Sequence, residues 1–172
     1  MAFGIDDGLS AAAAAISLTS TVVEVVKKYR KHPDVSIELL IEQVRVEAIA
    51  RINSADTALA EFEGMLKAKG IDPSKDLDEI IRKTPFWHPF EQRKLKHIRD
   101  EIQSLSNSVY DASDDISALV RCKDQTKEFG EAVVETIPQK HKFLTEILNA
   151  KSLKQKIEIL RGELRRQKDV LK

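Results

Sequence analysis

The chain has 172 residues, and its 28 basic and 28 acidic side chains balance, so no global charge directs it to nucleic acid or to an anionic surface. Charged residues make up 33% of the chain and aromatic residues only 5%, a composition typical of long helices rather than of sheet. Since this length suits one domain, we expect a single helical-bundle domain over residues 1–172.

The single cysteine and the acidic N-terminal residues indicate where in the cell the protein is found. Cys122 is the only cysteine and has no second cysteine with which to form an internal disulfide. Asp6 and Asp7 stand where a secretory leader would carry basic residues. We therefore expect a cytoplasmic protein, with association to a membrane left open.

The first predicted helix covers residues 7–31. Between Leu9 and Val26 its only charge is Glu24. A membrane-spanning helix needs about 20 predominantly apolar residues, and alanines and hydroxyl side chains dilute the apolar character of this one. A helix packed in the bundle is the favoured interpretation, and a membrane-active segment is the alternative.

The run that begins Gly8-Leu9-Ser10-Ala11 and ends at Val26 is a helix rich in small residues that leads into a helical bundle. It loosely resembles the start of HeLo-type and related cell-death bundle domains. The resemblance implies an N-terminal helix that is deployed into membranes on oligomerisation. The alternative function is therefore a membrane-active effector whose N-terminal helix inserts into or binds lipid.

Two long stripes of apolar residues follow heptad-like spacing in the middle of the chain. The first stripe lies in residues 35–69 and consists of Ile37, Ile41, Val44, Ala48, Ile52, Ala55, Leu59, Phe62 and Leu66. The second lies in residues 90–122 and consists of Leu95, Ile98, Ile102, Leu105, Val109, Ala112, Ile116 and Leu119. Their matched lengths predict an antiparallel coiled-coil-like hairpin. The fold we expect is all-α: an elongated helical bundle organised on this hairpin, with flanking N- and C-terminal helices.

The connection between the two stripes ends in residues 85–90, here called the aromatic turn. It contains Phe86, Trp87 and Phe90 between and beside two prolines, and it has basic neighbours on both sides: Arg82, Lys83, Arg93, Lys94 and Lys96. The favoured interpretation is that the three rings plug the end of the hairpin. The alternatives are a docking surface for a partner and a stacking platform for single-stranded nucleic acid.

The last predicted helix is basic. Residues 151–172 contain eight basic and three acidic side chains, a net charge of +5. Ser152 and Gln155 form a capping-box signature, and an apolar stripe from Leu153 to Leu171 keeps heptad spacing if Gln167 fills one position. This stripe can pack on the bundle, while the exposed face, with Arg161, Arg165 and Arg166, is a candidate surface for a partner and, as a weaker alternative, for nucleic acid.

The sequence contains no recognisable catalytic or metal-binding motif. None of the four histidines has Asp or Glu three residues before it, and the six glycines show no phosphate-loop spacing. No sequence feature places a base beside Cys122. We therefore expect no catalytic residue, no metal site, no cofactor and no enzymatic activity.

The function these features favour is that of a non-enzymatic helical interaction or scaffold protein with a protein partner. The candidate partner-binding residues are Phe86, Trp87, Phe90, Arg161, Arg165 and Arg166. A homodimer is a further hypothesis, because a second copy would cover any part of the long stripes that the chain leaves open. Nucleic acid is not expected as the main partner. The sequence leaves the specific role, the partner and the oligomeric state open.

Overall fold

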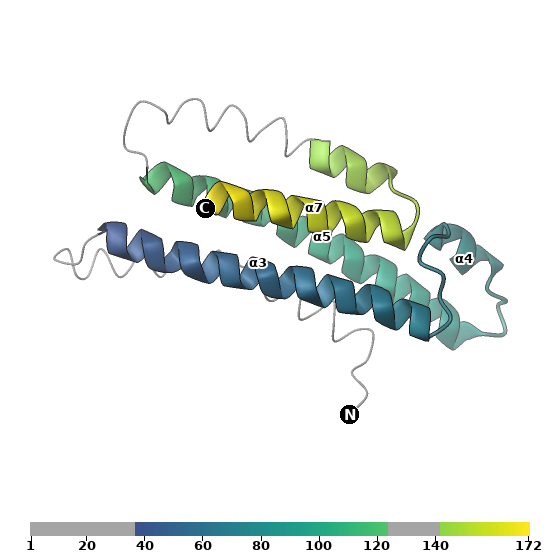
Figure 1. Ribbon diagram of the computed structural model, residues 1–172. Coiled ribbons are helices and arrows are strands. Elements are labelled where there is room, and N and C mark those ends of the chain that lie inside the picture. The colour runs from purple at the N-terminus through teal and green to yellow at the C-terminus, as the bar shows by residue number, and fades with distance from the viewer. Residues whose placement is uncertain (1–36, 124–141) are drawn as a thin grey trace.

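The computed structural model describes residues 37–123 and 142–172, and of residues 37–38, 40–41, 44 and 113–123 it describes only the backbone. This part of the chain is all-α and forms a helical bundle, which confirms the predicted fold class (Figure 1). The elements are α3 (Ile37–Ala68), α4 (Leu77–Lys83), α5 (Pro89–Lys123), a helical segment at 142–149, and α7 (Leu153–Leu171).

Helices α3 and α5 run antiparallel along the long axis of the bundle, as the predicted hairpin requires (Figure 1). Helix α7 lies alongside both of them, and each makes more extensive contact with α7 than with the other. The C-terminal helix is therefore a central element of the bundle, and not only a flanking one. Where their side chains are described, the residues of both predicted stripes are buried against other helices of the same chain.

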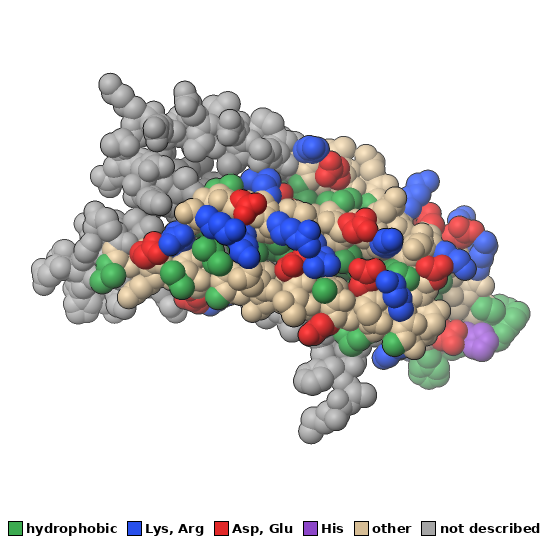
Figure 2. Space-filling view, in the orientation of Figure 1, with side chains coloured by type: hydrophobic (Ala, Val, Ile, Leu, Met, Phe, Trp, Pro, Cys, Tyr) green, Lys and Arg blue, Asp and Glu red, His purple; other side chains and the backbone are tan. Residues whose placement is uncertain are grey.

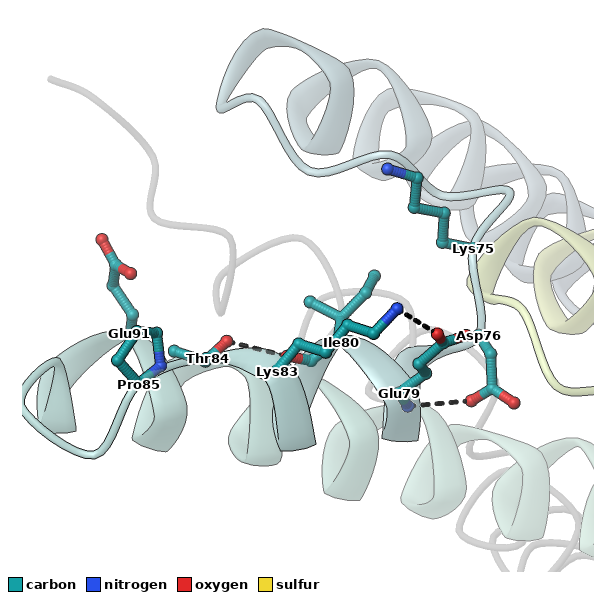
Figure 3. Close-up of a pocket in the computed structure, with 8 residues that line it drawn as sticks. All are labelled: Lys75, Asp76, Glu79, Ile80, Lys83, Thr84, Pro85 and Glu91. Atoms are coloured by element: carbon teal, nitrogen blue, oxygen red, sulfur yellow. Dashed lines mark hydrogen bonds and ion pairs between the residues drawn. The ribbon is translucent and has the colours of Figure 1, made fainter.

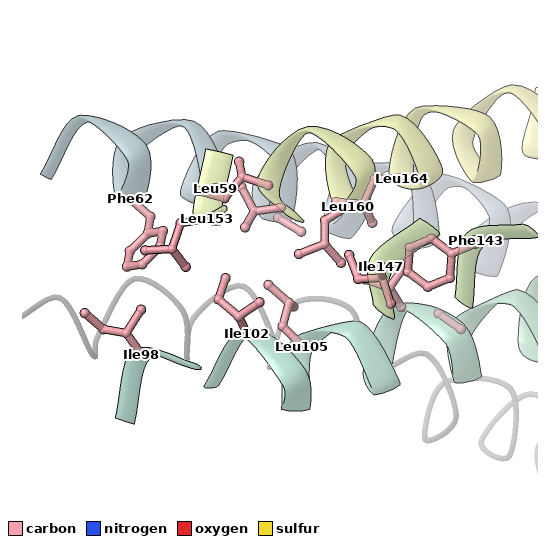
Figure 4. Packing of buried hydrophobic residues seen from close by; sticks show 14 of the residues in the cluster. Leu59, Phe62, Ile98, Ile102, Leu105, Phe143, Ile147, Leu153, Leu160 and Leu164 are labelled. Atoms are coloured by element: carbon pink, nitrogen blue, oxygen red, sulfur yellow. The ribbon is translucent and has the colours of Figure 1, made fainter. Parts of the chain in front are cut away.

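The core consists mainly of the predicted stripes, to which α4 adds Leu77 and Ile81 (Figure 4). Its members from the two long helices are Ala48, Ile52, Ala55, Leu59, Phe62 and Leu66 of α3 and Leu95, Ile98, Ile102, Leu105, Val109 and Ala112 of α5. Helix α7 adds Leu153, Ile157, Leu160, Leu164 and Leu171, with the buried Gln167 in the expected heptad position. The side chains of Ile37, Ile41, Val44, Ile116 and Leu119 lie outside the description.

A glycine, Gly70, follows the C-terminal end of helix α3. Gly70 has φ +74°, a conformation that glycine adopts at little cost. The Ile71 N–H donates to the Leu66 carbonyl at 3.0 Å, and the Gly70 N–H donates to the Lys67 carbonyl at 3.1 Å. These two bonds form a Schellman motif, which satisfies carbonyls that the helix end leaves open.

The start of α7 is tied to the loop before α4. Ser152 forms the predicted capping box with Gln155. In addition, the Leu77 N–H donates to the Lys151 carbonyl at 3.2 Å, and the Lys154 N–H donates to the Pro73 carbonyl at 2.8 Å. Two segments that are far apart in the sequence are thereby joined at one end of the bundle.

The helical segment 142–149 packs Phe143 and Ile147 into the core beside α7. The Lys156 ammonium donates to the Ile147 carbonyl at 3.0 Å and so satisfies a group at the end of that segment. Partial burial lowers the pKa of Lys156 below its ordinary value. The predicted helix at 7–31 lies outside the described residues. Among the described helices, none combines the length and the apolar character that crossing a bilayer requires.

Candidate docking surface at the aromatic turn

The backbone of the aromatic turn is held by local hydrogen bonds. The His88 N–H donates to the Pro85 carbonyl at 2.9 Å and closes a β-turn whose two central residues are Phe86 and Trp87. Helix α5 begins at the next residue, Pro89, a residue type suited to a first helical position. The Gln92 side-chain amide donates to the Thr84 carbonyl at 2.9 Å, which ties the end of α4 to the start of α5.

The three large rings of the turn face solvent. Phe86 is 82% exposed, Trp87 66% and Phe90 82%. The Phe86 and Trp87 rings contact each other edge to face, with 4.9 Å between their centroids. The prediction that the rings plug the end of the hairpin is wrong, because the central residues of a tight turn project away from the chain that the turn connects. Hydrophobic side chains project from this end of the molecule, as Figure 2 shows.

Basic side chains surround the turn. Residues 82–97 contain five basic and one acidic side chain, a net charge of +4 with the histidines neutral. Lys83 forms an ion pair with Glu79, and this contact lowers the pKa of the Glu79 carboxyl. Four exposed basic residues form no ion pair within the described parts of the chain: Arg82, Arg93, Lys94 and Lys96. Their charge is available to a ligand.

A shallow groove of about 530 Å³ lies beside α4, next to the turn (Figure 3). The Asp76 carboxylate accepts hydrogen bonds from the Asp78 and Glu79 N–H groups and caps the helix. The Thr84 hydroxyl donates to the Ile80 carbonyl at 2.8 Å. These polar groups serve the helix itself.

The predicted basic residues of α7 have separate roles. The Arg161 guanidinium donates to the Asp56 carboxylate of α3, with 2.6 Å between Nε and Oδ1. This contact lowers the pKa of Asp56 and raises that of Arg161. Arg166 forms an ion pair with the buried Glu163, with 2.8 Å between Nε and Oε2. Arg161 thus links α7 to α3, whereas the Arg166 pair lies within α7. Of the three arginines, only Arg165 is exposed.

The structure does not bring the two candidate surfaces together. The aromatic turn lies at the α4 end of the bundle, whereas α7 runs away from that end to the C-terminus (Figure 1). Four further apolar side chains are exposed, which the sequence analysis did not single out: Leu39, Val46, Leu148 and Val170. The seven-residue spacing of Leu39 and Val46 is the signal that could have identified this pair on α3.

Among the side chains that the structure describes, no three from His, Cys, Asp or Glu lie grouped as metal ligands. Comparison with protein-family models, with curated proteins and with solved structures found no match to this chain.

Proposed function

We propose that this protein is a non-enzymatic helical interaction or scaffold protein that docks partners through the ends and faces of its bundle. The observation that carries the proposal is the exposure of Phe86, Trp87 and Phe90 on one hydrogen-bonded turn. Aromatic side chains are the residues that most often dominate binding energy at interfaces. A rigid turn presents them with little conformational entropy left to lose on binding.

The second docking surface we propose is the exposed face of α7 around Arg165. The proposal includes a protein partner, held by at least one of the two surfaces, and a cytoplasmic location, which the single cysteine supports. The membrane-active alternative through residues 7–31 stays a prediction, because that segment lies outside the described residues.

Affinity capture with the full chain tests the proposal. We expect Trp87→Ala or Arg165→Glu to lose a protein that the wild type recovers. The matched control is Leu148→Ala, which removes an exposed apolar side chain from a different part of the surface. Arg166 is unsuitable for this test, because its reversal would disturb the buried Glu163. Equal recovery by the wild type and both variants would contradict the assignment of the surfaces.

A further inference from the structure

We propose that the aromatic turn is an insertion tip that docks this end of the bundle onto an anionic membrane surface. The inference rests on the proposed function, since it names the partner class for one of the two docking surfaces. It is argued from the exposure of the three rings, from their place on a projecting turn, and from the cations that follow them on α5.

The shape of the tip favours a fluid partner. Phe86 and Trp87 occupy the corner of a β-turn, and Phe90 follows in the first turn of α5. A protein partner would need a preformed pocket around all three projecting rings. The lipid–water interface has no fixed shape and is where tryptophan side chains accumulate in membrane proteins. Insertion also costs little ordering, because hydrogen bonds already hold the turn.

The charges next to the tip favour an anionic surface. Phe90, Arg93, Lys94 and His97 are spaced by three, four and seven residues, so they share one face of α5. The helical rise places Arg93 and Lys94 about 4.5–6 Å behind Phe90 along the axis. With the rings at the interface, the two cations lie at the level of the lipid phosphates, where basic residues strengthen binding to acidic lipids.

Single-stranded nucleic acid is the rival ligand, because rings and cations can also hold stacked bases. Binding of that kind uses a basic groove that follows the strand over several nucleotides. The groove beside the turn is lined by Asp76, Glu79 and Glu91 as well as by two lysines. The acidic lining disfavours a polyanionic strand, so we commit to the lipid surface.

Trp87 is the only tryptophan of the chain and therefore reports on the tip without a label. The full-length protein is mixed with phosphatidylcholine vesicles that contain phosphatidylserine, with pure phosphatidylcholine vesicles, and with a single-stranded oligonucleotide. We expect the vesicles with phosphatidylserine to shift the Trp87 emission to the blue and to float with the protein. Brominated acyl chains should quench the emission, and salt should weaken binding.

Two double variants separate the contributions and keep the reporter. Phe86→Ala with Phe90→Ala should weaken vesicle binding roughly tenfold or more, because binding scales with the apolar area inserted. Arg93→Glu with Lys94→Glu should abolish the preference for phosphatidylserine. Leu148→Ala, which lies away from the turn, is the control and should bind as the wild type does.

Three outcomes would overturn the inference. Vesicles that float the protein without shifting the Trp87 emission place lipid binding elsewhere in the chain. An emission shift with the oligonucleotide but not with vesicles assigns the tip to nucleic acid. Absence of any vesicle binding removes the membrane partner, while the proposed function still stands if Trp87→Ala loses a captured protein.

Discussion

The side-chain amide of Gln167 on α7 donates a hydrogen bond to the backbone carbonyl of Val109 on α5, with 3.0 Å between Nε2 and O. Gln167 is 1% exposed and is the polar member of an otherwise apolar stripe. A directional contact of this kind fixes how two helices lie along each other, because sliding by one residue breaks it, whereas apolar contacts tolerate a shift.

Replacing Gln167 tests this contact. We expect Gln167→Met, which keeps most of the volume but cannot donate, to lower the free energy of unfolding by about 1 kcal/mol. Gln167→Ala also leaves a cavity and should lower it by about 2–3 kcal/mol. Urea unfolding followed by circular dichroism measures both. A methionine variant as stable as the wild type would show that the bond contributes nothing to stability.

The central position of α7 predicts strong effects of truncation in its stripe. Leu160 is fully buried between α3 and α5, and Leu160→Ala should lower the free energy of unfolding by about 2–5 kcal/mol. Leu148→Ala is the matched control, because Leu148 is 70% exposed, and it should change stability by less than about 0.5 kcal/mol. Similar small losses in both variants would mean that α7 only flanks the hairpin.

Two exposed glycines inside helices offer stabilising changes. A Cβ atom added at Gly64 of α3 or Gly162 of α7 meets nothing within 4 Å apart from its chain neighbours and the backbone of its own helix. Each change to alanine should therefore raise the free energy of unfolding by up to about 1 kcal/mol, since glycine loses more backbone entropy in a helix. Gly70→Ala is the contrasting variant and should destabilise, because φ there is +74°. Thermal unfolding of the three variants gives the comparison.

The ion pair of Asp56 with Arg161 predicts a dependence on pH. The Arg161 hydrogen bond lowers the folded-state pKa of Asp56. Its stabilisation is therefore complete above the unfolded carboxyl pKa of about 3.9 and is lost as the pH falls through the lower folded value. Asp56→Asn should cost up to about 1 kcal/mol at neutral pH and nothing at the acid end. A difference between the two proteins that does not change with pH would contradict this.

Adjacent arginines of α7 should respond differently to charge reversal. Arg166→Glu places a second carboxylate beside Glu163, which is 7% exposed, and should lower the free energy of unfolding by about 2 kcal/mol or more. Arg165→Glu lies on the exposed face and should change it by less than about 0.5 kcal/mol. Urea unfolding at neutral pH measures both. Equal losses would mean that Arg165 also supports the bundle.

Much of the fold could be predicted because heptad spacing is a local signal. The stripes of α3 and α5 and the capping box of α7 are each visible in residues that lie close together in the sequence. The joint between the Pro73–Leu77 loop and the start of α7 was not predicted. It consists of backbone hydrogen bonds, such as that from the Leu77 N–H to the Lys151 carbonyl. Backbone groups of this kind do not depend on the side chain, so the sequence carries no signal for these bonds.

The candidate surfaces, too, were predictable in part from local sequence and depended in part on the tertiary structure. The sequence by itself determined which side chains have a core face, since spacing along a helix decides that, and it identified Phe86, Trp87 and Phe90 as unusual. Only the tertiary structure decided that these rings face solvent, because exposure depends on where the β-turn lies relative to the bundle end. Likewise, Arg161, Arg165 and Arg166 are alike in sequence, and only the positions of Asp56 and Glu163 around α7 separate two structural arginines from an exposed one.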